Sequence, residues 1–144
     1  MKILISHCFL GENCKYNGGN NYNAELLNVL KNHELIPVCP ETFGGLSSPR
    51  LPAEIVGDKV LFSDGGDATQ AFVNGAKKAL EIAKAQGVKV AVLKANSPSC
   101  GSGIIYDGTF TGKKTSGYGV AAKLLKENGI KVYSEQDIEE IKKL

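Results

Sequence analysis

The chain has 144 residues, which is the usual size of one domain and long enough to bury a core without help from disulfides or a metal. Its net charge is only +2, with 17 basic against 15 acidic residues, and no basic stripe with interleaved aromatic residues supports nucleic-acid binding. No apolar run approaches a membrane span and the segment MKILISHCFLGEN becomes polar too early for a signal peptide, so we expect a cytoplasmic protein whose four cysteines serve metal binding or catalysis rather than disulfides.

The first part of the chain predicts two strands with a helix between them. Ile3–Ser6 is a short apolar run typical of a buried strand. Cys8–Tyr22 is rich in glycine and asparagine and is expected to be a loop. Asn23 can cap a helix with leucines on one face, which Asn32 and His33 are expected to end, and Leu35–Val38 is the second apolar strand.

The next stretch combines a long loop with the longest helix. Pro40–Asp64 contains three prolines and three glycines, so we expect regular structure there only in Lys59–Phe62, as a short edge strand. A loop of this length in a small domain is usually functional or disordered, and the apolar residues and single arginine of this one favour a folded, functional loop. Asp67 is expected to cap a helix that runs to Gln86 and stops at Gly87.

The remaining elements repeat the strand and helix alternation. Val88–Leu93 is rich in β-branched residues and predicts a central strand buried on both faces. Lys94–Tyr118 is expected to be a second long loop, and Gly119–Asn128 a helix. Ile130–Tyr133 is the last predicted strand, and a terminal helix is expected to begin at Ser134.

Strands and helices thus alternate along the whole chain, and the predicted strands have no polar face. This pattern is typical of an α/β fold in which a parallel sheet carries helices on both faces, a Rossmann-like three-layer arrangement. No repeat, low-complexity tract or linker divides the sequence, so we expect residues 1–144 to form a single domain. The two long loops both follow strands and are expected to wall a pocket at the carboxyl edge of the sheet.

Three cysteines share one position relative to the predicted strands. Cys8, Cys39 and Cys100 each follow an apolar strand, and parallel neighbours would bring all three to one edge of one sheet. Their separation along the chain excludes a CxxC pair and the spacings of zinc ribbons and ferredoxins. The alternative is that these cysteines are small buried hydrophobic residues.

Three thiolates with no nearby fourth ligand suit an iron–sulfur cluster with one open iron, or a zinc ion with one open position. Cys14 lies six residues after Cys8 in a flexible loop and could be a fourth ligand. We slightly prefer the alternative that Cys14 is a loop thiol without a role.

Polar residues beside these cysteines could take part in catalysis. Glu41 lies two residues after Cys39, so in an extended chain it would point to the same side and could act as a general base. Ser97 and Ser99 flank Pro98 and could hydrogen-bond a substrate or cluster sulfur. All three could equally be ordinary loop residues.

Three basic residues have weaker claims. Lys94 follows the central strand and could stabilise a developing anion, although a lysine that extends into solvent is the default interpretation. Arg50 could bind an anion or pair with Glu54, and the sequence does not favour either. His7 could be a metal ligand, but a single histidine beside a strand end is more often structural.

Four segments of the chain resemble, in order, the bacterial and archaeal thiouracil desulfidase family: HCFLGENCKYNGG, PVCPETFGGLSSPRLPAEI, LKANSPSCGSGIIYDGTFTG and GYGVAAKLLKENGIKVYSE. The resemblance implies a compact α/β domain with a [4Fe-4S] cluster held by Cys8, Cys39 and Cys100, and no need for a cysteine at position 14. It also implies non-redox removal of sulfur from a small thiolated base such as 2-thiouracil, with Glu41 as the acid/base residue and Ser97 assisting.

The sequence departs from the family pattern in two loops, Lys15–Asn17 and TSGYG, and both departures leave the substrate open. A second hypothesis from a different class is a non-catalytic module that binds an iron–sulfur cluster or zinc. The oligomeric state does not follow from the sequence.

Overall fold

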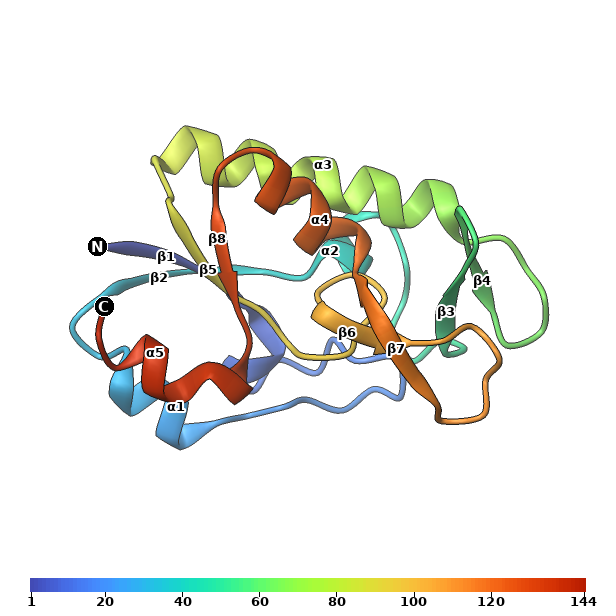
Figure 1. The fold of residues 1–144 in the computed structure, drawn as a ribbon, viewed down its shortest axis with the longest axis horizontal. Coiled ribbons are helices and arrows are strands. Elements are labelled where there is room, and N and C mark those ends of the chain that lie inside the picture. Colours follow the sequence, from blue (N-terminus) through green and yellow to red (C-terminus); the bar gives the residue numbers. More distant parts are fainter.

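The computed structural model describes residues 1–144 and has a parallel four-stranded sheet at its centre (Figure 1). The strand order is β2, β1, β5, β8, and all neighbouring pairs run parallel. The strands are β1 (Lys2–Ser6), β2 (Glu34–Val38), β5 (Val90–Val92) and β8 (Lys131–Tyr133). The predicted α/β architecture with a parallel sheet is therefore confirmed.

One face of the sheet is covered by α3 (Thr69–Gln86) and α4 (Val120–Glu127), which pack against each other as well as on the strands. The buried side of α3 is made of residues three or four positions apart, mostly alanine, so the helix lies close to the sheet. Gly87 ends this helix in the left-handed conformation, as predicted. The buried residues of this layer are Leu4, Val38, Ala79, Ala83, Val88, Ala91, Leu93, Cys100, Ala122, Leu125 and Ile130.

The other face is covered by α1 (Ala24–Val29) and α5 (Ile138–Ile141). Asn23 caps α1 by accepting a hydrogen bond from the Leu26 backbone, as predicted. Ser134 begins the short 3-10 helix η2 (Glu135–Asp137) with a capping box, and α5 follows directly. The buried residues of this second layer are Ile3, Ile5, Phe9, Leu26, Leu30, Val90, Val92 and Ile141.

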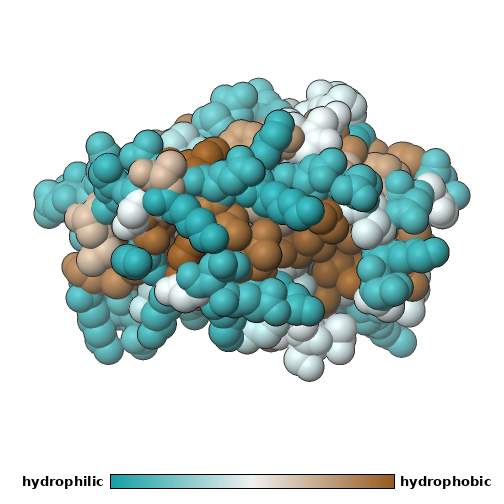
Figure 2. All heavy atoms as spheres, turned by 90° about the horizontal axis from the view of Figure 1, so that it is seen from above, coloured by the Kyte–Doolittle hydropathy of each residue, from teal (hydrophilic) through white to brown (hydrophobic).

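Alternate residues of the central strands belong to opposite layers, since successive side chains of a strand point to opposite faces. This explains why β1 is apolar from Ile3 to Ile5 and β5 is apolar throughout, so that neither strand has a polar face. Figure 2 shows the outer surface on the side of α3, where hydrophilic residues cover most of the surface around a central hydrophobic band.

The first long loop contains more regular structure than expected. It begins with the short helix α2 (Pro40–Phe43), and Pro40 suits the first position of a helix because its missing amide hydrogen would be unpaired there anyway. The predicted strand Lys59–Phe62 is present as β4, but it pairs antiparallel with β3 (Ala53–Val56), which the sequence analysis assigned to loop.

The second long loop also contains an unexpected hairpin, formed by β6 (Ser102–Tyr106) and β7 (Lys114–Tyr118). The strands β3, β6 and β7 were not predicted because they are short and partly exposed, and because they belong to hairpins that do not join the central sheet. Such strands show little hydrophobic alternation, which is the signal that a sequence provides.

Candidate functional site

Three of the cysteines lie in segments that follow neighbouring strands of the sheet. Cys8 lies in the 3-10 helix η1 (His7–Leu10), which begins directly after β1, whereas the sequence analysis expected a loop there. Cys39 follows β2 as the N-cap residue of α2, and Cys100 lies in the turn between β5 and β6. Because β1 lies between β2 and β5, the three segments emerge side by side at the carboxyl edge.

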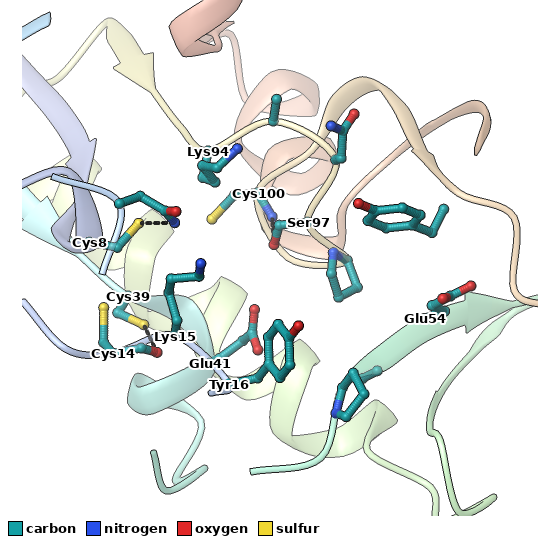
Figure 3. A pocket seen from close by; sticks show the side chains of 17 residues that line it. Cys8, Cys14, Lys15, Tyr16, Cys39, Glu41, Glu54, Lys94, Ser97 and Cys100 are labelled. Atoms are coloured by element: carbon teal, nitrogen blue, oxygen red, sulfur yellow. Dashed lines mark hydrogen bonds between the residues drawn. The ribbon is translucent and has the colours of Figure 1, made fainter. Parts of the chain in front are cut away.

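All three thiols line one pocket with a volume of about 520 Å³. Figure 3 shows the cysteines gathered at one end of this pocket and Glu54 at the other. Cys14 also lines the pocket and is buried, so the structure places it with the other three cysteines rather than in an exposed loop. The structure thus brings all four cysteines of the chain to one site.

The pocket favours thiolates at two of these positions. Hydrogen bonding with Cys14 lowers the pKa of Cys8 to about 7 and the pKa of Cys39 to about 6, whereas the pKa of Cys14 itself is raised by the same bonds. Asn21 also donates a hydrogen bond to the Cys8 sulfur at 3.3 Å. Burial raises the pKa of Cys100 to about 12. Deprotonated thiols are the form that binds metal.

A chain of hydrogen bonds connects Glu41 to the turn that carries Cys100. Ser99 Oγ donates to Glu41 Oε2 at 2.8 Å and lies 2.9 Å from Ser97 Oγ. Ser97 Oγ in turn accepts hydrogen bonds from the backbone amides of Ser99 and Cys100, both at 3.1 Å. Ser97 therefore shapes the turn, while Ser99 is the serine in contact with the carboxylate.

Contrary to the prediction, the backbone between Cys39 and Glu41 is not extended, because Pro40–Phe43 forms the helix α2. Glu41 nevertheless lines the same pocket as Cys39, because α2 begins at the pocket and Glu41 is in its first turn.

Arg50 pairs with Glu41 rather than with Glu54. Its Nη2 atom lies 3.0 Å from Glu41 Oε1. The alternative pairing with Glu54 is wrong, since Glu54 Oε1 accepts the backbone amides of Gly108 and Phe110 instead. Glu54 thus holds the tip of the β6–β7 hairpin against β3.

Lys94 has a partner that the sequence analysis missed. Its Nζ atom lies 2.6 Å from Glu135 Oε2, and the other carboxylate oxygen of Glu135 accepts the Ala95 amide at 2.8 Å. Glu135 is 41 positions further along the chain, so no local pattern could have revealed it. The Nε2 atom of His7 lies 3.9 Å from Glu12 Oε2, and His7 does not line the pocket.

The donor set of the pocket was tested against the two kinds of metal centre that the sequence left open. No three His, Cys, Asp or Glu side chains converge closely enough to hold a single metal ion. A cluster needs less convergence, because each thiolate binds a different iron. Several soft sulfur donors in one pocket, with no imidazole lining it, therefore fit an iron–sulfur cluster.

Comparisons with known proteins found a family model, a curated relative and a solved structure that match this chain. Residues 3–137 match the family described as 2-thiouracil desulfurase. The chain is 42% identical to the uncharacterised protein YbbK of Bacillus subtilis (strain 168), over 96% of this chain and 99% of YbbK. It is also similar to the solved structure of the [4Fe-4S]-dependent thiouracil desulfidase TudS, with a TM-score of 0.92 and 41% identity, over 97% of this chain and 94% of that one.

Proposed function

This chain belongs to the 2-thiouracil desulfurase family, and from that membership we propose that it is an iron–sulfur-dependent enzyme that removes sulfur from a thiolated nucleobase such as 2-thiouracil. The observation that carries the proposal is the pocket itself, in which four cysteines and the Glu41–Ser99–Ser97 hydrogen bonds lie together. The thiols are proposed to be the ligands of an iron–sulfur cluster, and the Glu41 carboxylate is proposed to accept a proton.

Cys8, Cys39 and Cys100 are the residues proposed to hold a [4Fe-4S] cluster. When it is bound through three thiolates, such a cluster has one iron without a protein ligand, and this iron supplies a thiophilic Lewis acid for the C=S group. Cys14 is not needed as a ligand in this arrangement. Its hydrogen bonds lower the pKa of Cys8 and of Cys39, which favours the ligand form of both.

The overall reaction is a hydrolysis. Water adds to the ring carbon, the C–S bond breaks, and both electrons of that bond leave with sulfur as sulfide, so no external reductant is required. The protein must position the base, exclude bulk water and remove a proton from the attacking water.

Glu41 is proposed to remove that proton. Glu41 lines the pocket, and its Oε2 atom already accepts a hydrogen bond from Ser99, so a proton taken from water can be shared with the serine hydroxyls. Ser97 is proposed to assist by holding the turn of Cys100 and by orienting Ser99. Lys94 is the remaining candidate for a catalytic residue. It lines the pocket, and its positive charge is partly balanced by Glu135.

Three further proposals concern the cellular compartment, the number of domains and the class of substrate. We place the activity in the cytoplasm, where four free cysteines stay reduced. Residues 1–144 are proposed to act as one desulfidase-like domain on a small molecule, not on nucleic acid. None of the helices is long and apolar enough to cross a membrane.

The proposal is tested with protein purified without oxygen. We expect a brown protein that holds about four irons per chain, absorbs broadly near ~400 nm and releases sulfide from 2-thiouracil. Glu41→Gln should keep the iron and the fold, because glutamine is nearly isosteric, but release sulfide ~10²–10⁴-fold more slowly. Glu139→Gln, a change of the same kind in an exposed ion pair, is the matched control and should behave like the parent.

The same assay separates the alternatives. A colourless protein with one zinc would contradict the cluster. A brown protein that releases no sulfide from any thiolated base would be the non-catalytic cluster-binding module. A Glu41→Gln variant with parental activity at equal iron content would remove Glu41 from the mechanism.

A further inference from the structure

Arg50 is the single arginine of the chain, and the other side chains with a permanent positive charge are lysines. The lysines are mostly exposed, whereas the Arg50 side chain is only 7% exposed. Arginine differs from lysine in its planar fork of five N–H donors, which can hold several acceptors in a fixed geometry. A chain that uses lysine everywhere else has arginine at the one place where a cation is buried beside a proposed catalytic carboxylate.

The guanidinium group of Arg50 donates hydrogen bonds to acceptors in three separate segments of the chain. Nε and Nη2 donate to the same oxygen of Glu41, at 3.2 and 3.0 Å. Nη2 also donates to the Cys14 carbonyl at 2.9 Å, and Nη1 donates to the Ser47 carbonyl at 2.9 Å. One side chain thus joins α2, the loop after η1 and its own loop.

These contacts give the two oxygens of the Glu41 carboxylate different partners. Arg50 binds Oε1 through two donors, and Ser99 binds Oε2. A carboxylate held by one donor can rotate about its terminal bond, whereas donors on both oxygens restrict that rotation. Arg50 therefore helps to fix the plane of the Glu41 carboxylate, so that one oxygen stays directed to Ser99.

The backbone around Arg50 strengthens the link to the loop. The Arg50 amide donates to the Tyr16 carbonyl, and Ser48 Oγ donates to the Lys15 carbonyl. Together with the bond from Nη2 to the Cys14 carbonyl, three consecutive carbonyls are held by the turn that carries Arg50. Cys14, Lys15 and Tyr16 all line the pocket, so this segment is a wall of the site (Figure 3).

From these contacts we propose that Arg50 is a positioning residue that locks the Glu41 carboxylate to the Cys14–Tyr16 wall, so that the base and this side of the pocket move as one unit. The inference rests on the proposed function for the role of Glu41, but the mechanical link is a property of the fold alone. Lysine cannot replace Arg50, because one ammonium group cannot bind Glu41, Cys14 and Ser47 in this geometry.

The first test is a double-mutant cycle on sulfide release, with each rate divided by the iron content. Arg50→Lys keeps the charge and loses the fork, and we expect kcat to fall about 10- to 100-fold with KM changed only a few-fold, since small misplacement of a catalytic group has effects of this order. In the Glu41→Gln background the same change should cost no further rate, because Arg50 acts through Glu41. Losses that multiply, or a parental kcat for Arg50→Lys, would overturn the proposal.

The second test is hydrogen exchange of the backbone amides in residues 15–17. We expect Arg50→Lys to exchange faster there than the parent while α3 and the sheet stay protected, and unchanged exchange would overturn the proposal. This measurement does not need activity, so it decides the mechanical link even if the parent releases no sulfide and the proposed function fails. If Arg50→Lys does not fold, Arg50→Gln, whose amide keeps a donor, takes its place in both tests.

A control separates positioning from general loss of stability. Ile141 is buried in the core layer on the far face of the sheet, and Ile141→Ala should lower the urea midpoint of unfolding because it leaves a cavity there. It should nevertheless keep the parental kcat per iron and parental exchange at residues 15–17. An equal loss of kcat in Ile141→Ala would show that the effect of Arg50 is only structural.

Discussion

At the scale of single residues, the four cysteines differ in where they stand relative to the sheet. Cys8, Cys39 and Cys100 belong to segments that leave three adjacent parallel strands, so the sheet itself sets their mutual positions. Cys14 belongs to a loop that is held from outside the sheet, partly by Arg50. The side chains lie in one pocket, but only the first three are anchored by the core.

This difference leads to a prediction about metal content. Replacing Cys8, Cys39 or Cys100 with alanine should abolish cluster binding, whereas Cys14→Ala should retain about four irons per chain. The reason is that a [4Fe-4S] cluster with an open iron needs three thiolates. Iron and acid-labile sulfide are measured on the four variants, all purified without oxygen. Loss of iron in Cys14→Ala would mean four protein ligands and no open iron, and the catalytic hypothesis would fail with it.

At the scale of elements, the packing of α2 against α3 determines the positions of two proposed site residues. A β-carbon added to Gly75 of α3 would lie 1.6 Å from the Pro40 carbonyl oxygen, and one added to Gly44 would lie 1.9 Å from the Ala71 carbonyl oxygen. The two backbones are therefore in direct contact. Cys39 and Glu41 are carried by α2, so their positions depend on two glycines that never touch the pocket.

Gly75→Ala tests this dependence. In a free helix alanine is more stable than glycine by about 1 kcal/mol, but here the methyl group must displace α2. We expect a net loss of about 1–3 kcal/mol in the free energy of unfolding, together with lower iron content and slower sulfide release. Urea unfolding and iron analysis measure both effects. Asn74→Ala, on the exposed side of the same helix, is the control and should lower neither the free energy of unfolding nor the iron content. A more stable Gly75→Ala variant with full iron would contradict the prediction.

At the scale of the whole molecule, the core and the site are largely separate. The two core layers lie on the faces of the sheet, whereas the pocket lies at its carboxyl edge and is lined largely by loops. Of the four thiols, only Cys100 belongs to a core layer. A chain of this size can remain folded on these layers alone.

We therefore expect the protein without its cluster to keep its secondary structure but to melt at a lower temperature than the loaded protein, because a group that binds only the native state stabilises it. Hydrogen exchange should increase in the pocket segments, residues 7–22 and 94–101, and stay low in α3 and β1. Circular dichroism and hydrogen exchange before and after chelation provide the comparison. Complete unfolding after chelation would show that the cluster is part of the fold, as in small zinc domains.

The sequence by itself determined the parallel sheet, the helices on both faces and the three cysteines at strand ends. These features depend on local patterns, namely apolar runs, helical spacing, and caps such as Asn23 and Gly87. The resemblance of whole segments to a known family added the cluster and the activity, and the comparisons confirm that family.

Only the tertiary structure decided how the polar residues of the site are paired. Arg50 with Glu41, Lys94 with Glu135, and Ser99 rather than Ser97 with Glu41 are contacts between residues 9, 41 and 58 positions apart. The two hairpins, and the seating of α2 on α3, likewise escaped sequence analysis. The physical reason is the same in each case. Which partner a side chain, strand or helix contacts depends on how elements that are distant in the chain pack together. A local sequence pattern contains no information about that packing.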